Sequence, residues 1–222
     1  MKKAGLKLYE ISYSTLINKA QTYQPALDLC QEMKKAGLKI DEITYSILIN
    51  KAQTYQQGFD LFEEMKKAGL TPNEISYNSL INKVETYQQG FDWFEKMKKA
   101  GLTPNEITYS TLINKAETYQ QALDLFEEMK KAWLKLYEIT YSTLINKAQT
   151  YQQALDLCQE MKKAGLKLDE ITYSTLINKA QTTAPFFTFN FSFKIFRNCS
   201  SESFDNIFFL VFRYCSFIFL KS

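Results

Sequence analysis

The chain contains no histidine. Histidine is the commonest proton shuttle near neutral pH and the commonest metal ligand, so its absence excludes His-dependent catalysis and His-containing zinc sites. Only four residues are cysteines, and none of them forms a Cys-x-x-Cys pair, which excludes zinc ribbons and thioredoxin-type motifs. We therefore expect no metal ion and no other cofactor.

Long apolar runs and strong net charge are also missing. No segment reaches the roughly 20 apolar residues of a membrane span, and the N-terminus carries no secretory signal, so we expect a protein that is not secreted. The net charge of +3 is too small to indicate a polyanion partner by itself. The sequence shows no Gly-rich phosphate loop, nucleophile elbow or metal-ligand cluster, so we expect no enzymatic activity and no small-molecule substrate.

What the chain does contain is a repeat of 32 residues. The phrase EITYSTLINKA recurs with small changes around Tyr13, Tyr45, Tyr77, Tyr109, Tyr141 and Tyr173. A fixed period of this size is typical of a solenoid. It predicts a remnant of a truncated repeat (1–9), five repeats (10–41, 42–73, 74–105, 106–137 and 138–169), a partial sixth repeat (170–184) and a non-repeat tail (185–222).

Each unit has the pattern of two helices. In the second unit, Asp41 is a suitable N-cap, and apolar residues then recur at helical spacing up to Ala52. Thr54 and Gln57 form a capping-box pattern that begins a second helix, and Gly69 supplies the left-handed residue that commonly ends one. The short connection predicts an antiparallel hairpin, and stacked hairpins bury each other's apolar faces. The predicted fold is all-α, a right-handed superhelical solenoid of αα-hairpins.

Three positions depart from the repeated phrase in ways that matter for packing. Cys30 and Cys158 occupy the position that holds phenylalanine in the second, third and fourth units. Because cysteine is among the most buried residue types, we expect both to be buried thiols. Trp133 stands at the helix-ending glycine position of the fourth unit, where a left-handed conformation would cost about 1 kcal/mol.

The order of these motifs resembles the pentatricopeptide repeat. The phrases ITYSTLIN, ALDLFEEMKKAGL and, in two units, LTPNE are similar to that family's two helices and connector, from about residue 1 to residue 181. The tetratricopeptide pattern fits worse, because its Trp and Leu-Gly signature is missing from the first helix. The units are shorter than the family's usual length of about 35 residues. The loss falls at the turn between the helices, which bears on the spacing of bases.

The resemblance implies binding of single-stranded RNA at about one base per repeat, and a role in RNA processing, stability or translation. In the family, the residue after the tyrosine and the last residue before the next unit form what we call a reading pair. Carried over, the pairs are Ser14 with Asp41, Ser46 with Asn73, Asn78 with Asn105, Ser110 with Tyr137, and Ser142 with Asp169.

By the same resemblance, Ser with Asp favours G, Ser with Asn favours A, and Asn with Asn favours a pyrimidine. The Ser–Tyr pair of the fourth unit matches no usual combination. The implied target is 5′-G-A-Y-N-G-3′, parallel to the protein. The alternative interpretation is that the serines and asparagines follow helix preferences, and that Asp41 and Asn73 are merely N-caps.

Two further sets of residues recur with the repeat. The resemblance implies that isoleucines sandwich each base, namely Ile11, Ile43, Ile75, Ile107 and Ile139. A lysine near the end of each first helix could follow a phosphate backbone and make binding salt-sensitive; this ladder is Lys19, Lys51, Lys83, Lys115, Lys147 and Lys179. The alternative for the lysines is a solvated helix end favoured by the helix dipole.

A second function stays open on the sequence alone: a helical scaffold that binds a peptide or a partner helix in its concave groove. Protein partners are compatible with either function. The resemblance implies a mitochondrion or plastid if the source is eukaryotic, and the cytoplasm otherwise.

The two ends of the chain do not follow the repeat. Met1 aligns with Met33 and Met65, which lie late in a second helix, so we expect a fragment of a longer array whose first intact hairpin begins near Glu10. Residues 185–222 hold 12 of the 17 phenylalanines and the only arginines. Three interpretations of this tail compete: a frameshift or read-through product, a short membrane-associating segment (membrane contact being the less favoured), and a cap on the last repeat.

Overall fold

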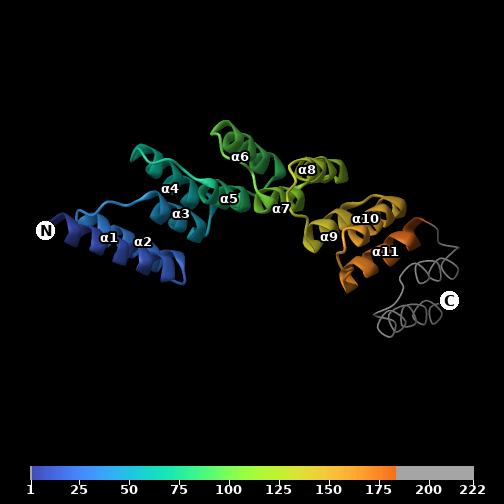
Figure 1. Cartoon of the computed structure of the whole chain (residues 1–222), viewed down its shortest axis with the longest axis horizontal. Coiled ribbons are helices and arrows are strands. Elements are labelled where there is room, and N and C mark those ends of the chain that lie inside the picture. Colours follow the sequence, from blue (N-terminus) through green and yellow to red (C-terminus); the bar gives the residue numbers. More distant parts are fainter. Residues whose placement is uncertain (1, 184–222) are drawn as a thin grey trace. The chain divides into compact units, whose positions relative to one another are not determined.

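Eleven α-helices make up the regular structure of residues 2–183, which are the residues that this computed structural model describes; side chains are described for residues 9–180 (Figure 1). No strand occurs among them, and the predicted all-α class is confirmed. The helices are α1 (Lys2–Lys19), α2 (Tyr23–Lys35), α3 (Glu42–Lys51), α4 (Tyr55–Lys67), α5 (Glu74–Lys83), α6 (Tyr87–Lys99), α7 (Glu106–Lys115), α8 (Tyr119–Lys131), α9 (Glu138–Lys147), α10 (Tyr151–Lys163) and α11 (Glu170–Thr183).

The local signals in the sequence set the ends of these helices. The side chain of Asp41 accepts a hydrogen bond from the Thr44 amide at 2.8 Å and so caps α3. Thr54 and Gln57 form the predicted capping box at the start of α4. Gly69 follows α4 with a φ of +75°, in the left-handed region. The predicted hairpin of the second unit is therefore confirmed at its two starts and at its end.

The chain forms two compact units, Met1–Leu136 with α1 to α8 and Tyr137–Ser222 with α9 to α11. In the first unit, the first helices of successive repeats pack on one another in the order α1, α3, α5, α7, and each also packs on its own second helix. In the second unit, α9 packs on both α10 and α11. The first unit is thus a stack of αα-hairpins, as a solenoid requires, and in the second unit α11 packs on the hairpin of α9 and α10.

The core of each hairpin comes from the apolar positions of both helices. In the second repeat, Leu48 and Ile49 of α3 and Met65 of α4 are fully buried, and Phe62 is almost so. Cys30 and Cys158 are also buried, and neither is in a disulfide, which confirms the prediction of buried thiols. Their position is therefore a core position of the second helix.

The segment before Glu10 belongs to the first helix. α1 runs continuously from Lys2 to Lys19, so no break separates the predicted remnant (1–9) from the first repeat. Residues 2–9 form the first half of this helix. The later predicted boundaries coincide with the first residues of α3, α5, α7, α9 and α11.

The predictions for the tail fall on residues 185–222, with Cys199 and Cys215, and these lie outside the described residues. Among the helices that are described, none combines the length and apolar character needed to span a membrane.

The fourth repeat ends in a strained position. Trp133 has a φ of +55°, the one non-glycine value in the left-handed region among the described residues. The glycines at the same position in the other repeats have φ between +71° and +77°. Trp133 is 95% exposed, so no packing offsets the roughly 1 kcal/mol that this conformation costs a residue with a Cβ.

Candidate nucleic-acid interface

An isoleucine lies exposed near the start of the first helix of every repeat. The exposed fraction of these side chains ranges from 57% to 72%. They are Ile11, Ile43, Ile75, Ile107, Ile139 and Ile171. Because the first helices pack side by side within each unit, each unit presents such isoleucines at the same place on neighbouring helices. Regularly spaced, exposed aliphatic groups of this kind are typical of a binding surface rather than of a core.

The two members of a predicted reading pair lie close together in two repeats. The Ser46 hydroxyl donates to Asn73 Oδ1 at 3.0 Å. The Asn78 amide donates to Asn105 Oδ1 at 3.4 Å. Each pair links the first helix of one repeat to the N-cap residue of the next repeat's first helix.

In the Ser–Asp repeats, a threonine connects the pair. Ser14 Oγ and Thr44 Oγ1 are 2.8 Å apart, and the Thr44 amide donates to Asp41. In the fifth repeat, Ser142 Oγ lies 3.1 Å from Thr172 Oγ1 of the partial sixth repeat. The Thr172 hydroxyl donates to Asp169 at 2.6 Å. This threonine was not among the residues predicted from the sequence, although it recurs with the period and stands three residues after the N-cap.

The same bridging position is buried in the third and fourth repeats. The Thr108 hydroxyl lies 2.7 Å from Asn78 Oδ1 and 3.1 Å from Asn105 Oδ1. Thr108 is fully buried, as are its counterparts Thr44 and Ser76. A buried hydroxyl that bonds both members of a pair fixes their orientation, which is the usual function of a satisfied buried polar network.

Ser46 has a more enclosed position than the other predicted reading residues. It is 1% exposed, and its hydroxyl lies 2.7 Å from the Glu42 carbonyl oxygen and 2.9 Å from Ser76 Oγ. In contrast, Ser14, Asn78, Ser110 and Ser142 are half-buried. In the second repeat, the more accessible polar member of the pair is therefore Asn73.

The second member of each pair except Tyr137 caps the following helix with its side chain. Asp41, Asn73 and Asn105 each accept a hydrogen bond from a backbone amide in the first turn of the following helix. Asp169 does the same for the amide of Thr172. Tyr137 makes no side-chain cap. Capping holds these side chains in one rotamer at the surface, so capping and base contact are compatible.

The lysine ladder has a structural use that the sequence did not show. Lys51 donates to the Ala20 carbonyl at 2.6 Å, Lys83 to that of Asn50 at 2.9 Å, and Lys115 to that of Val84 at 2.6 Å. In the partial sixth repeat, Lys179 donates to the Asn146 carbonyl at 3.0 Å. Each lysine thus satisfies carbonyls at the C-terminal end of the preceding first helix, which otherwise lack partners.

Burial lowers the pKa of Lys83, Lys115 and Lys179 below the ordinary lysine value. These lysines therefore lie at helix ends, as the alternative interpretation expected, but they are packed between neighbouring helices rather than solvated. Lys147 occupies the same half-buried position in α9, whereas Lys19 is exposed. Phosphate contact by these lysines stays a prediction.

Comparison with known proteins identifies the repeat. Residues 28–86 match the family model of the pentatricopeptide repeat domain, and residues 83–116 match that of the PPR repeat family. No curated protein matches the chain.

Several solved structures have a similar fold. The pentatricopeptide repeat protein PPR10 from maize matches with a TM-score of 0.59 and 21% identity over 88% of this chain and 30% of its own. PPR10 in complex with an 18-nucleotide psaJ RNA element matches with a TM-score of 0.58 and 22% identity, over 87% and 30%. The PPR domain of Arabidopsis thaliana protein-only RNase P 1, in complex with tRNA, matches with a TM-score of 0.58 and 16% identity, over 81% and 96%.

The chain thus spans less than a third of the length of PPR10 and nearly the whole of the PPR domain of that RNase P. At these identities the structural likeness establishes the fold. The sequence models establish the repeat type independently for residues 28–116. Residues 28–116 of the chain are thus pentatricopeptide repeats.

Proposed function

We propose that the chain binds single-stranded RNA along its first helices, at about one base per repeat, and acts in RNA processing, stability or translation. The observation that carries this proposal is the exposed isoleucine beside a hydrogen-bonded polar pair, found at the same place in neighbouring repeats. An aliphatic side chain can cover the face of a base while the polar pair bonds to its edge. Two of the structural relatives are complexes with RNA.

The proposed contacts to bases come from the reading pairs, and the target is 5′-G-A-Y-N-G-3′. The fourth base is left open because Ser110 is paired with Tyr137, which offers neither a carboxylate nor an amide. The repeats act by binding alone, and catalysis is not part of the proposal. In a eukaryotic cell, the proposed place of action is a mitochondrion or plastid.

Replacing Asn73 with aspartate is expected to change the preferred second base from A to G. Aspartate caps a helix about as well as asparagine, so α5 should remain intact. The substitution exchanges an amide donor for a carboxylate acceptor, and one good side-chain–base pair discriminates by about tenfold or more. Equilibrium binding of the full chain to 5′-GACAG-3′ and 5′-GGCAG-3′ RNA measures the change.

The reciprocal variant is Asp41→Asn, which should move the first base from G towards A without affecting the second. If Asn73→Asp leaves the ratio of the two affinities unchanged, the assignment of reading pairs is wrong. If neither RNA is bound by any variant at low salt, the chain is better explained as a peptide-binding scaffold.

A further inference from the structure

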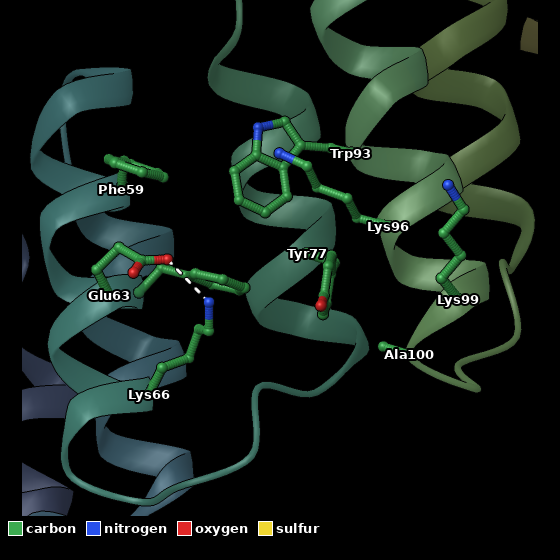
Figure 2. A pocket seen from close by; sticks show the side chains of 9 residues that line it. Phe59, Glu63, Lys66, Tyr77, Trp93, Lys96, Lys99 and Ala100 are labelled. Carbon is green, nitrogen blue, oxygen red and sulfur yellow. Dashed lines mark hydrogen bonds and ion pairs between the residues drawn. The ribbon is translucent and has the colours of Figure 1, made fainter.

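A pocket of about 480 Å³ lies between the second helices of the second and third repeats, and none of its lining residues belongs to the candidate RNA interface (Figure 2). Its walls are aromatic. The ring of Trp93 lies 6.1 Å from that of Phe59, 5.1 Å from that of Phe62 and 5.9 Å from that of Tyr77, measured between centroids. α4 supplies the two phenylalanines, α5 the tyrosine and α6 the tryptophan.

The polar lining of the pocket is mainly cationic. Three lysines, Lys66, Lys96 and Lys99, line it together with a single carboxylate, Glu63. Lys66 lies 3.1 Å from Glu63, and Lys96 lies over the Trp93 ring at 4.3 Å from its centroid. Figure 2 shows Lys96 beside the Trp93 ring and Lys99 further along α6, and Glu63 is the one carboxylate among the lining residues.

The other repeats place a carboxylate at the corresponding position. The tyrosine of the first helix donates to a glutamate 19 residues later: Tyr45 to Glu64 at 2.9 Å, Tyr109 to Glu128 at 3.1 Å, and Tyr141 to Glu160 at 3.3 Å. A lysine of the preceding second helix also bonds this glutamate, as Lys34 does to Glu64 and Lys98 does to Glu128.

The carboxylate at this position is electrostatically well placed. Burial alone would raise the pKa of Glu64, but the hydrogen bonds from Lys34 and Tyr45 outweigh burial and lower it. The tyrosine hydroxyl and the preceding lysine thus stabilise the ionised form of this carboxylate.

In the third repeat this carboxylate is missing. The residue 19 positions after Tyr77 is Lys96, and the same residue is 30 positions after Lys66. An ammonium group donates hydrogen bonds and cannot accept them, so Lys96 can accept neither from the Tyr77 hydroxyl nor from Lys66. Lys66 bonds instead to Glu63 on its own helix. Trp93, which replaces the leucine found at this position in the other repeats, adds the aromatic wall beside the vacant acceptor position.

We infer that this pocket binds an acidic peptide segment of a partner protein, in which a glutamate or aspartate stands next to an aromatic or large aliphatic residue. The carboxylate of the segment takes the place that glutamate holds in the other repeats. It accepts from the Tyr77 hydroxyl and pairs with Lys66 and Lys96, while the neighbouring apolar side chain packs on Trp93 and Phe59. The excess of three lysines over one glutamate favours an acidic segment over a neutral or basic one.

The test uses the fluorescence of Trp93. Because Trp93 and Trp133 are the only tryptophans, Trp133→Gly makes Trp93 the sole reporter in the full chain. The probe is the blocked peptide Gly-Phe-Glu-Gly, with Gly-Phe-Gln-Gly as its uncharged counterpart. We expect saturable quenching or enhancement with the acidic peptide, and an affinity about tenfold weaker for the glutamine peptide.

Lys96→Glu supplies the missing carboxylate from within the chain. It should restore the contacts seen in the other repeats, and the affinity for the acidic peptide should fall about tenfold or more while thermal stability is kept. Lys131→Glu makes the same charge change at the end of α8, outside the pocket, and should leave peptide binding unchanged. Tyr77→Phe, which keeps the ring and removes the hydroxyl, should weaken binding severalfold.

Two results would overturn the inference. One is equal binding of the acidic peptide by the Lys96→Glu variant and its parent. The other is a loss of RNA affinity in Lys96→Glu without any peptide binding by the parent, because the pocket would then take a phosphate. The residues tested belong to none of the reading pairs, so failure here is separate from failure of the proposed RNA function.

Discussion

Replacing the four isoleucines Ile43, Ile75, Ile107 and Ile139 with alanine is expected to weaken RNA binding by a hundredfold to a thousandfold. Each side chain is 57% to 67% exposed in the structure, so a base stacked on it would bury fresh apolar surface. Losing most of that surface should cost roughly 1 kcal/mol per position, and four positions give about 4 kcal/mol in the binding free energy. Titration of the full chain with labelled 5′-GACAG-3′ RNA measures the effect.

The fold should tolerate this variant. Substitutions at exposed positions usually change the free energy of unfolding by about 0.5 kcal/mol or less, and alanine is a better helix former than isoleucine. A matched control replaces one exposed glutamine per repeat with alanine. These glutamines lie on the second helices, and each bonds to the aspartate four residues later. These are Gln56, Gln88, Gln120 and Gln152. If the isoleucine variant binds RNA as tightly as the parent and the glutamine variant binds more weakly, the interface lies on the second helices and the proposal is wrong.

The largest expected effect on stability is that of Phe94→Ala. Phe94 is fully buried in α6, with its ring 5.5 Å from that of Tyr109 and 5.6 Å from that of Phe91. Removing a buried phenylalanine leaves a cavity that typically costs about 3–5 kcal/mol. Because a solenoid is stabilised by contacts between neighbours, the loss should concentrate in the third and fourth repeats.

Urea unfolding gives the total loss, and hydrogen exchange shows which helices lose protection. Phe94→Leu, which keeps most of the volume, should cost about 1.5 kcal/mol or less. A uniform loss of protection along α1 to α8 would show that the first unit unfolds as one block instead. A total loss below about 1 kcal/mol would show that the hairpin repacks around the cavity.

The helices themselves could be predicted from the sequence, because the signals that set them are local. Asp41 at an N-cap, Thr54 in a capping box and Gly69 at a helix end each act within a few residues. Because the units repeat, the helix ends predicted in one unit apply to the equivalent residues of the others. Residues 2–9 lie outside the complete units, and their continuity with the first helix could not be read from the repeated pattern.

Contacts between repeats were harder to predict. Lys115 was placed correctly at a helix end, but its bond to the Val84 carbonyl depends on how α5 and α7 pack. The burial of Ser46 depends likewise on Ser76 of the next repeat, 30 residues away. The sequence shows Lys96 in place of glutamate, yet its meaning appears only once Tyr77 is seen to face that position.

The central claim, that the chain binds RNA with a preference set by its reading pairs, is tested most directly by selection from a random RNA library. The full chain would be equilibrated with the library at about 50 mM salt and washed at about 200 mM, because phosphate contacts weaken steeply over this range. The account predicts retention at the lower salt and enrichment of 5′-G-A-Y-N-G-3′ in the retained RNA. Failure to retain any RNA at the lower salt, or retention without enrichment at the first three positions, would contradict it.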